Sequence, residues 1–259
     1  MGNGMMEEQT QKGAEIGLRI LNRDVIKYIA MFTMLLNHIA HVFLTVGTPF
    51  RELLEDIGYF TAPVMCYFMV EGYAYTRSKV RYGLRLLLFA IFSQIPFQLV
   101  FGRNYGLNMI YTLFCCFLIL VVMERVSSPL LREVLGVLLI LATTVGDWAV
   151  IAPLLTIFLA NGRGDRRKTA LGFGAGYVLF WLLGVQHFMS VEQGGGTAYA
   201  VVHAAFAGLG ILAAAVVILV FYNGKRAQGG RNFSKWFFYI FYPAHLLLLY
   251  VIKMSLHNM

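Results

Sequence analysis

Apolar residues along the chain gather into nine continuous segments separated by short polar stretches. Most of these segments approach the roughly 20 residues that a helix needs to cross a bilayer. The runs are continuous, whereas the strands of a membrane barrel alternate between apolar and polar residues. The pattern therefore predicts an all-α, polytopic transmembrane helical bundle with spans at residues 25–46, 57–75, 84–101, 107–123, 133–146, 147–160, 169–186, 198–221 and 236–254.

The fifth and sixth segments have about 14 residues each, which is too short for a full crossing. We expect two short helices that meet at Gly146-Asp147, inside a funnel below the membrane surface. The first 24 residues are mostly polar and predict an N-terminal arm, so residues 25–259 form a single transmembrane domain. The first span then serves as its own insertion signal.

Composition and charge agree with a membrane protein. Hydrophobic residues make up 59% of the 259 residues and charged residues 13%, against about 25% charged residues in soluble domains. The net charge of +8 would suit nucleic acid, but the basic residues lie in short loops between the apolar runs. We therefore expect the lipid bilayer as a partner, and no nucleic acid.

The basic residues also predict an orientation. Eighteen of the 21 lysines and arginines lie in the N-terminal arm or in the loops after spans two, four, six and eight; the other three are Arg51, Arg103 and Lys253. Because cytoplasmic loops are enriched in Lys and Arg, the arm and the N-terminus are expected inside and the C-terminus outside. This arrangement requires an odd number of spans, about nine.

Two predicted spans carry histidines near the middle of the bilayer. His38 lies about 13 residues into the first span, which is roughly 20 Å at the rise of a helix, and Asn37 and His41 share roughly one side of that helix with it. His245 lies about ten residues into the last span, at a similar depth. Polar groups at such depth usually face a bundle interior, and they are candidates for a functional site.

Two carboxylates are further candidates. Glu71 lies near the inner end of the second span, where we expect Arg77 or Arg85 as its partner. Asp147 begins the sixth segment, where it caps a helix at the outer surface or, at depth, orients a histidine. A metal site is the lesser alternative, since zinc requires a third and a fourth ligand beside a histidine pair. His245 and Asp147 would have to join His38 and His41, and we expect no metal.

Basic residues crowd the loop after the second span, at Arg77, Lys79, Arg81 and Arg85. Arginine pairs with phosphate through two parallel hydrogen bonds. This loop, together with Lys235, is therefore a candidate binding site for the phosphates of coenzyme A, whose pantetheine arm would enter the bundle. The chain has no glycine-rich phosphate loop.

Several segments together resemble one family, the TraX proteins. They lie in the same order over about residues 25–252, and the most specific are Tyr242-Pro243-Ala244-His245 and Ser93-Gln94-Ile95-Pro96-Phe97. The others are the residues 27–39 around Asn37-His38, Ala62-Pro63-Val64, Glu71-Gly72-Tyr73, Thr76-Arg77, Arg85-Leu86-Leu87, Asn108 with Thr112-Leu113, Asp147, and residues 238–241.

The resemblance implies a function. TraX proteins are associated with N-terminal acetylation of conjugative pilin, and the family is similar to the transmembrane acyltransferases that use acyl-CoA. In that class a histidine of an early span is taken as catalytic, which here is His38. TraX proteins usually have Asp before this histidine, where this chain has Asn37. The resemblance also implies an integral protein of the bacterial cytoplasmic membrane.

We therefore expect transfer of an acetyl group from acetyl-CoA, the acyl donor, to an amine or hydroxyl of a peptide N-terminus or a sugar. His38 would act as general base, Asp147 or Glu71 would orient a histidine, and His245 would assist or hold the thioester carbonyl. Direct transfer and transfer through an acylated His38 both remain open. The alternatives are a proton-coupled transporter of small solutes and a non-catalytic assembly factor of a secretion or conjugation system.

Overall fold

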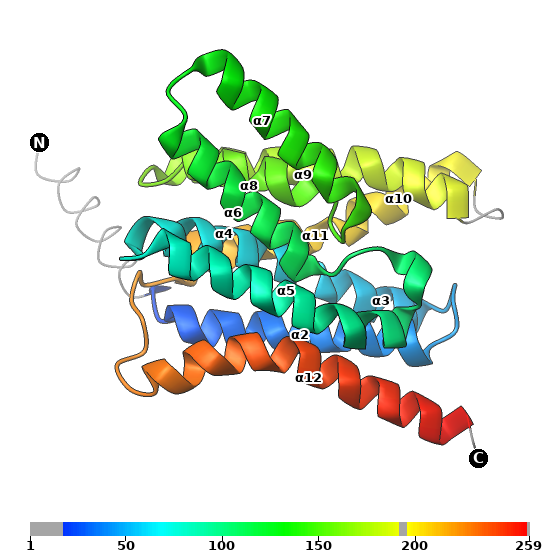
Figure 1. The fold of residues 1–259 in the computed structure, drawn as a ribbon. Coiled ribbons are helices and arrows are strands. Elements are labelled where there is room, and N and C mark those ends of the chain that lie inside the picture. The colour runs from blue at the N-terminus through cyan, green and yellow to red at the C-terminus, as the bar shows by residue number, and fades with distance from the viewer. Residues whose placement is uncertain (1–17, 192–195, 258–259) are drawn as a thin grey trace, which may run out of the picture.

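The computed structural model describes residues 18–191 and 196–257, and within these ranges the chain is helical, with two isolated β-bridges and no strand longer than that. The predicted all-α class is confirmed. Figure 1 shows the helices as a bundle of roughly antiparallel elements. In chain order they are α2 (Arg23–Phe43), α3 (Pro49–Gly58), α4 (Thr61–Tyr75), α5 (Lys79–Phe101), η1 (Arg103–Tyr105), α6 (Met109–Arg125), α7 (Pro129–Ala142), η2 (Thr143–Val145), α8 (Ile151–Asn161), α9 (Arg166–Val191), α10 (Gly196–Ala207), α11 (Leu209–Val216), η3 (Val217–Phe221) and α12 (Arg231–His257).

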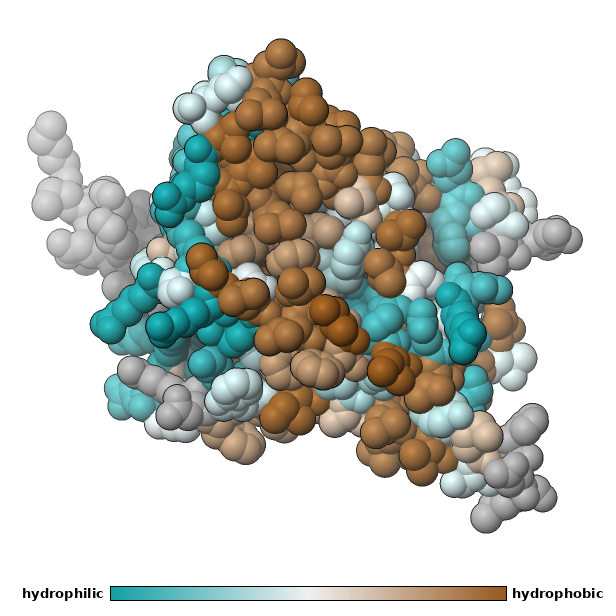
Figure 2. All heavy atoms as spheres, viewed as in Figure 1, coloured by the Kyte–Doolittle hydropathy of each residue, from teal (hydrophilic) through white to brown (hydrophobic). Residues whose placement is uncertain are grey.

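Six stretches of the described chain are long and apolar enough to cross a membrane: Arg23–Phe43, Pro49–Tyr75, Lys79–Phe101, Arg166–Ser190, Gly196–Phe221 and Phe233–Leu256. The other three predicted spans correspond to the shorter helices α6, α7 and α8, of 17, 14 and 11 residues. In Figure 2 hydrophobic residues cover the middle of the molecule and hydrophilic residues gather at its two ends. The protein is therefore an integral membrane protein, and the count of nine spans stays a prediction.

Helix α4 lies at the centre of the bundle and packs against α2, α6, α8 and α11. Ten of its 15 residues are buried. Helix α12 closes the bundle from the other side, against α2 and α5. This packing brings the first and the last long helices together, which Figure 1 shows in blue and orange.

Asparagine side chains fix the start of two helices. Asn22 accepts hydrogen bonds from the backbone N–H groups of Asp24 and Val25 and so caps α2, in the way that Asn commonly caps helices. Asn108 caps α6 in the same way and also donates to the Ala90 carbonyl and to Gln94 Oε1, both at 2.7 Å. These bonds fix the middle of α5 against the start of α6.

The two predicted short helices correspond to α7, which ends at Ala142, and α8, which begins at Ile151, so Gly146-Asp147 lies in the connection between them rather than at a direct junction. The connection is held by backbone bonds of 2.7 Å from Leu107 N–H to the Val145 carbonyl and of 2.9 Å from Asp147 N–H to the Leu107 carbonyl. Trp148 and Val150 have positive φ angles of 56° and 63°, which is uncommon for any residue but glycine and rare for a β-branched one. Such strain clusters at functional sites.

Helices α2 and α3 approach each other closely at Gly58. A Cβ atom on this glycine would lie 2.2 Å from the Cβ atom of Asn37. We expect Gly58→Ala to destabilise the protein by about 1–3 kcal/mol, as overpacking of a close contact does, and to lower its melting temperature in detergent. Gly136→Ala on α7 is the matched control, because nothing lies within 4 Å of a Cβ there. Equal melting temperatures for both variants would contradict this packing.

Candidate functional site

A cavity of about 800 Å³ runs along the inside of the bundle. At one end its wall contains six cationic side chains: Arg23, Lys27, Arg77, Arg85, Arg226 and Lys235. They lie at the start of α2, at the ends of α4 and α5 that meet there, and around the start of α12. Toward the other end the wall contains His38, His41, Tyr105, Asp147, Trp148 and His187. We call the six cationic side chains the cationic mouth. One cavity therefore connects the cationic mouth with the predicted histidine site.

His38 and His245 meet inside the bundle. His38 Nδ1 lies 2.7 Å from His245 Nε2, and the two rings are nearly parallel, with an interplanar angle of 5°. Both side chains are buried, with exposed fractions of 8% and 5%. His38 lines the cavity, whereas His245 lies behind it, outside the lining. The packing of α12 against α2 thus confirms that the two histidines reach the same depth.

The hydrogen bonds of the pair determine where the protons lie. His245 Nδ1 is 2.8 Å from the Phe241 carbonyl oxygen, and a carbonyl only accepts, so Nδ1 carries the proton. In a neutral imidazole the Nε2 atom of His245 is then an acceptor. His38 Nδ1 must donate to it, which leaves the Nε2 atom of His38 without a proton. This is the tautomer that a general base needs, and His245 rather than a carboxylate holds it.

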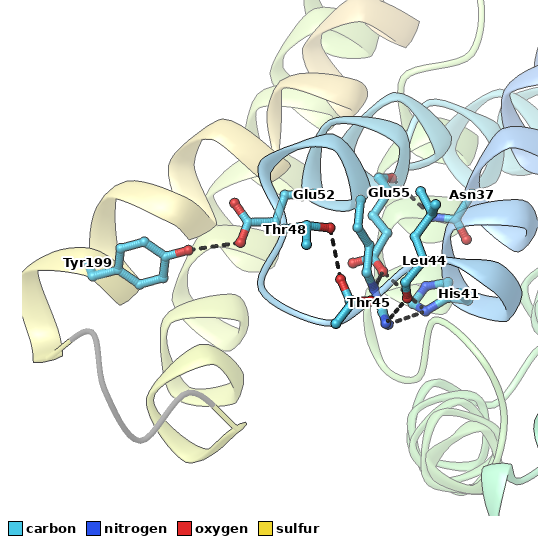
Figure 3. A network of polar contacts seen from close by, with 9 residues as sticks. Asn37, His41, Leu44, Thr45, Thr48, Glu52, Glu55 and Tyr199 are labelled. Carbon is cyan, nitrogen blue, oxygen red and sulfur yellow. Dashed lines mark hydrogen bonds and ion pairs between the residues drawn. The ribbon is translucent and has the colours of Figure 1, made fainter.

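The two polar residues of α2 on either side of His38, Asn37 and His41, bind to α3 (Figure 3). Asn37 Nδ2 donates to the Glu55 carbonyl oxygen at 3.0 Å. His41 Nδ1 lies 3.3 Å from both Arg51 Nη2 and Glu55 Oε1. Asn37 therefore turns toward α3 and forms no dyad with His38. The histidine pair does not involve Asn37, because the side-chain contact to His38 comes from His245 on α12.

Neither predicted carboxylate contacts a histidine of the pair. Glu71 forms an ion pair with Arg23, at 3.6 Å, and accepts a 2.7 Å hydrogen bond from the Tyr222 hydroxyl. The prediction that Arg77 or Arg85 pairs with Glu71 was wrong, because packing places the start of α2 beside the end of α4. The carboxylate of Asp147 accepts a hydrogen bond from the Trp148 backbone N–H. The side-chain contact to His38 that we expected from Asp147 or Glu71 comes from His245.

The alternative of a metal site required His38, His41, His245 and Asp147 to converge. Among the described residues no group of three or more His, Cys, Asp or Glu side chains gathers closely enough to hold a metal ion. His41 is engaged by Arg51 and Glu55, and Asp147 does not come close enough to the histidines of the described chain to share a metal ion with them. These four side chains therefore do not form the site that the spacing allowed.

The five predicted phosphate-binding cations divide into two groups. Arg77, Arg85 and Lys235 line the cavity, and the Nε atom of Arg85 is buried without a hydrogen-bond partner in the described chain. Lys79 instead forms a salt bridge with Glu124 on α6. Arg81 is exposed and lies outside the cavity lining. The basic side chains of this loop point in different directions, so only Arg77 and Arg85 of the loop line the cavity.

The sequence analysis missed the other half of the cationic mouth. Arg23 and Lys27 lie one helical turn apart at the start of α2, a spacing that places them on one face. Arg226 is brought beside them because Leu21 pairs with Tyr222 in a parallel bridge, and Arg23 N–H donates to the Lys225 carbonyl at 2.9 Å. The spacing of Arg23 and Lys27 was visible in the sequence. The pairing with residues 221–225 was not.

Fold and site together define a polytopic membrane protein with a histidine pair, one member of which lines an internal cavity. The profile of the TraX protein family matches residues 22–253, so the chain belongs to the TraX family. It is similar to the probable fimbrial assembly protein FimC, serogroup H1, of Dichelobacter nodosus. The two are 31% identical over 245 residues, which cover 89% of this chain and 95% of that protein. No solved structure matches the chain.

Proposed function

We propose that the protein is a membrane-embedded acetyltransferase that moves the acetyl group of acetyl-CoA to an acceptor amine or hydroxyl. The observation that carries this proposal is the histidine pair, which presents an unprotonated nitrogen to a cavity with a cationic mouth. Acetyl transfer from acetyl-CoA requires a base near the thioester and a surface that binds the phosphates of coenzyme A. The cavity joins both in one continuous space. Membership of the TraX family supports the same conclusion.

The chemistry follows from the tautomer of His38. The Nε2 atom of His38 takes the proton of the acceptor while the acceptor's lone pair forms a bond to the thioester carbonyl carbon. The tetrahedral intermediate then collapses, the carbon–sulfur bond breaks, and the leaving thiolate takes the proton from His38. The products are the acetylated acceptor and coenzyme A. The reaction involves no oxidation or reduction. His245 keeps the Nδ1 proton of His38 in place throughout.

The cationic mouth binds the phosphates in this proposal, and the pantetheine arm follows the cavity to His38. The basic end then faces the cytoplasm, in accord with the distribution of Lys and Arg, and the membrane is the bacterial cytoplasmic one. The acceptor reaches His38 from the opposite end, past Tyr105, Asp147 and His187. The name of the D. nodosus relative refers to fimbrial assembly, and a peptide N-terminus is therefore the first acceptor to test, ahead of a glycan.

The experiment uses the purified protein in lipid nanodiscs with acetyl-CoA labelled on the acetyl group. The acceptor probe is a synthetic peptide with a free N-terminus, and the same peptide with a blocked N-terminus is the control. We expect release of free thiol with transfer of label to the free peptide only. Absence of both binding and thiol release would overturn the proposal and favour a non-catalytic assembly role. Transport of a small solute across the membrane together with a proton, in the absence of peptide, would favour a transporter.

The cationic mouth makes a separate prediction about binding. Arg85→Ala should weaken the binding of coenzyme A by roughly 10–100-fold, since a hydrogen bond to a charged group contributes about 1.5–3 kcal/mol. Arg81→Ala, one turn earlier on the same helix but outside the cavity lining, should leave the dissociation constant unchanged. Isothermal titration of both variants checks the difference. Equal loss in both would mean that general positive charge, and not the cavity wall, attracts the ligand.

A further inference from the structure

The hydroxyl of Tyr242 is a buried polar group with no acceptor. Tyr242 is 5% exposed, and its Oη atom has no hydrogen-bond partner in the part of the chain that the structure describes. The polar backbone group beside Oη is the N–H of Met109, which is itself a donor. The phenol proton is therefore left without a partner. Buried polar groups in folded proteins are almost always hydrogen-bonded, so the exception requires an explanation.

The position of Tyr242 links this hydroxyl to the histidine pair. Tyr242 lines the cavity and lies three residues before His245 on α12. Its ring makes edge contacts with both histidines, with centroids 6.2 Å from His38 and 5.6 Å from His245. The unpartnered hydroxyl and the unprotonated nitrogen of His38 therefore belong to one wall of one cavity, where a single bound acyl group can face both.

The start of helix α6 supports the same hydroxyl. Asn108 caps this 17-residue helix and accepts from the N–H groups of Ile110 and Tyr111, and Met109, the first residue of the helix, lies beside the Tyr242 hydroxyl. The N-terminus of a helix carries partial positive charge. The start of α6 near Tyr242 therefore also favours negative charge that develops beside this hydroxyl.

The sequence predicted that His245 would assist or hold the thioester carbonyl, but neither of its ring nitrogens is free to do so in the structure. Both ring nitrogens of His245 are engaged, one with the Phe241 carbonyl and one with His38. His245 also lies outside the cavity lining. In the cavity wall beside His38, the Tyr242 hydroxyl is therefore the candidate donor to the thioester carbonyl oxygen.

We propose that Tyr242 is a catalytic residue that donates a hydrogen bond to the thioester carbonyl oxygen as this atom becomes an oxyanion. The inference rests on the proposed acetyltransferase function and adds the group that stabilises the developing charge. No proton is transferred: the O–H bond of Tyr242 stays intact, the negative charge forms on the carbonyl oxygen when the acceptor attacks, and it disappears when the carbon–sulfur bond breaks.

The kinetic test compares Tyr242→Phe with Tyr250→Phe. The first variant should lower the single-turnover rate by roughly 10²–10³-fold, the usual effect of removing one oxyanion donor. The dissociation constant for acetonyl-CoA, a thioether analogue that keeps the carbonyl, should stay within about twofold of wild type, since the interaction strengthens only in the transition state. Tyr250 lies on the same helix, outside the cavity lining, and its phenylalanine variant should keep the wild-type rate.

A spectroscopic readout separates this role from a structural one. Acetyl-CoA labelled with ¹³C at the carbonyl is bound to the His38→Ala variant without acceptor, so that the expected slow turnover leaves the thioester intact, and the infrared carbonyl stretch is recorded. The stretch should lie at lower frequency than in water-free solvent, and adding Tyr242→Phe should reverse that shift. Because phenylalanine only removes an unpartnered hydroxyl, the melting temperature should stay equal to that of the parent or rise.

The outcomes distinguish the two proposals. Wild-type turnover with an unchanged rate and carbonyl frequency in Tyr242→Phe would overturn the role of Tyr242 and leave the acetyltransferase intact. Failure of the wild-type protein to bind acetyl-CoA would overturn both. A loss of rate in Tyr242→Phe that is matched by Tyr250→Phe, or by a lower melting temperature, would assign Tyr242 to the packing of α12 instead.

Discussion

The His38→Ala variant should release thiol from acetyl-CoA roughly 10²–10⁴-fold more slowly than the wild-type protein, which is the range that a positioned general base contributes. His38 is the member of the histidine pair that lines the cavity, and its Nε2 atom is the nitrogen without a proton. Alanine removes this base and leaves the cationic mouth, which lies at the other end of the cavity. Thiol release and the binding of coenzyme A, measured side by side, check the expectation.

His41→Ala is the control for this prediction. His41 lies one turn further along α2 and is engaged by Arg51 and Glu55, so its loss should change the rate by less than about tenfold, as expected for a group that handles no proton in the reaction. Equal rates for the wild type and His38→Ala would remove His38 as the base. Label that stays on the wild-type protein when acceptor is withheld, and is absent from His38→Ala, would show transfer through an acylated histidine.

The second large effect concerns His245. His245→Leu should slow thiol release by roughly 10²–10³-fold, because it removes the acceptor for the Nδ1 proton of His38 and so releases the tautomer and the ring orientation that a base requires. His245→Gln should recover part of the rate, since the amide oxygen of glutamine can accept the same proton. Binding of coenzyme A should be unaffected in both, because His245 lies outside the cavity lining.

The pH profile distinguishes positioning from packing. If His245 acts through His38, the two variants will differ in the pH at which the rate falls, because His38 titrates in a different setting in each. A leucine variant and a glutamine variant with identical rates and identical pH profiles would contradict the role of His245 in positioning His38. The melting temperature of each variant, measured in the same detergent, shows whether α12 still packs against α2.

The sequence by itself determined the class of protein and the residues of the pair. Continuous apolar runs predict membrane-spanning helices because backbone groups in hydrocarbon must bond within their own helix. The costly burial of His38 and His245 at midspan identified them as candidates for a functional site, because polar groups at such depth usually face a bundle interior. The resemblance to TraX proteins over residues 25–252 also came from local residues, and the family is confirmed.

Only the tertiary structure decided how these residues work together. The partner of Glu71 is Arg23 rather than Arg77 or Arg85, and Arg81 and Lys79 turn away from the cavity that Arg85 enters. Side chains close in sequence point to different sides of a helix, whereas the contacts that define the site join residues as far apart as His38 and His245. Helical periodicity gives the depth and face of a residue, but the rotation of one helix against another comes from packing alone. That rotation assigns the Nδ1 proton of His38 and leaves the hydroxyl of Tyr242 unpaired.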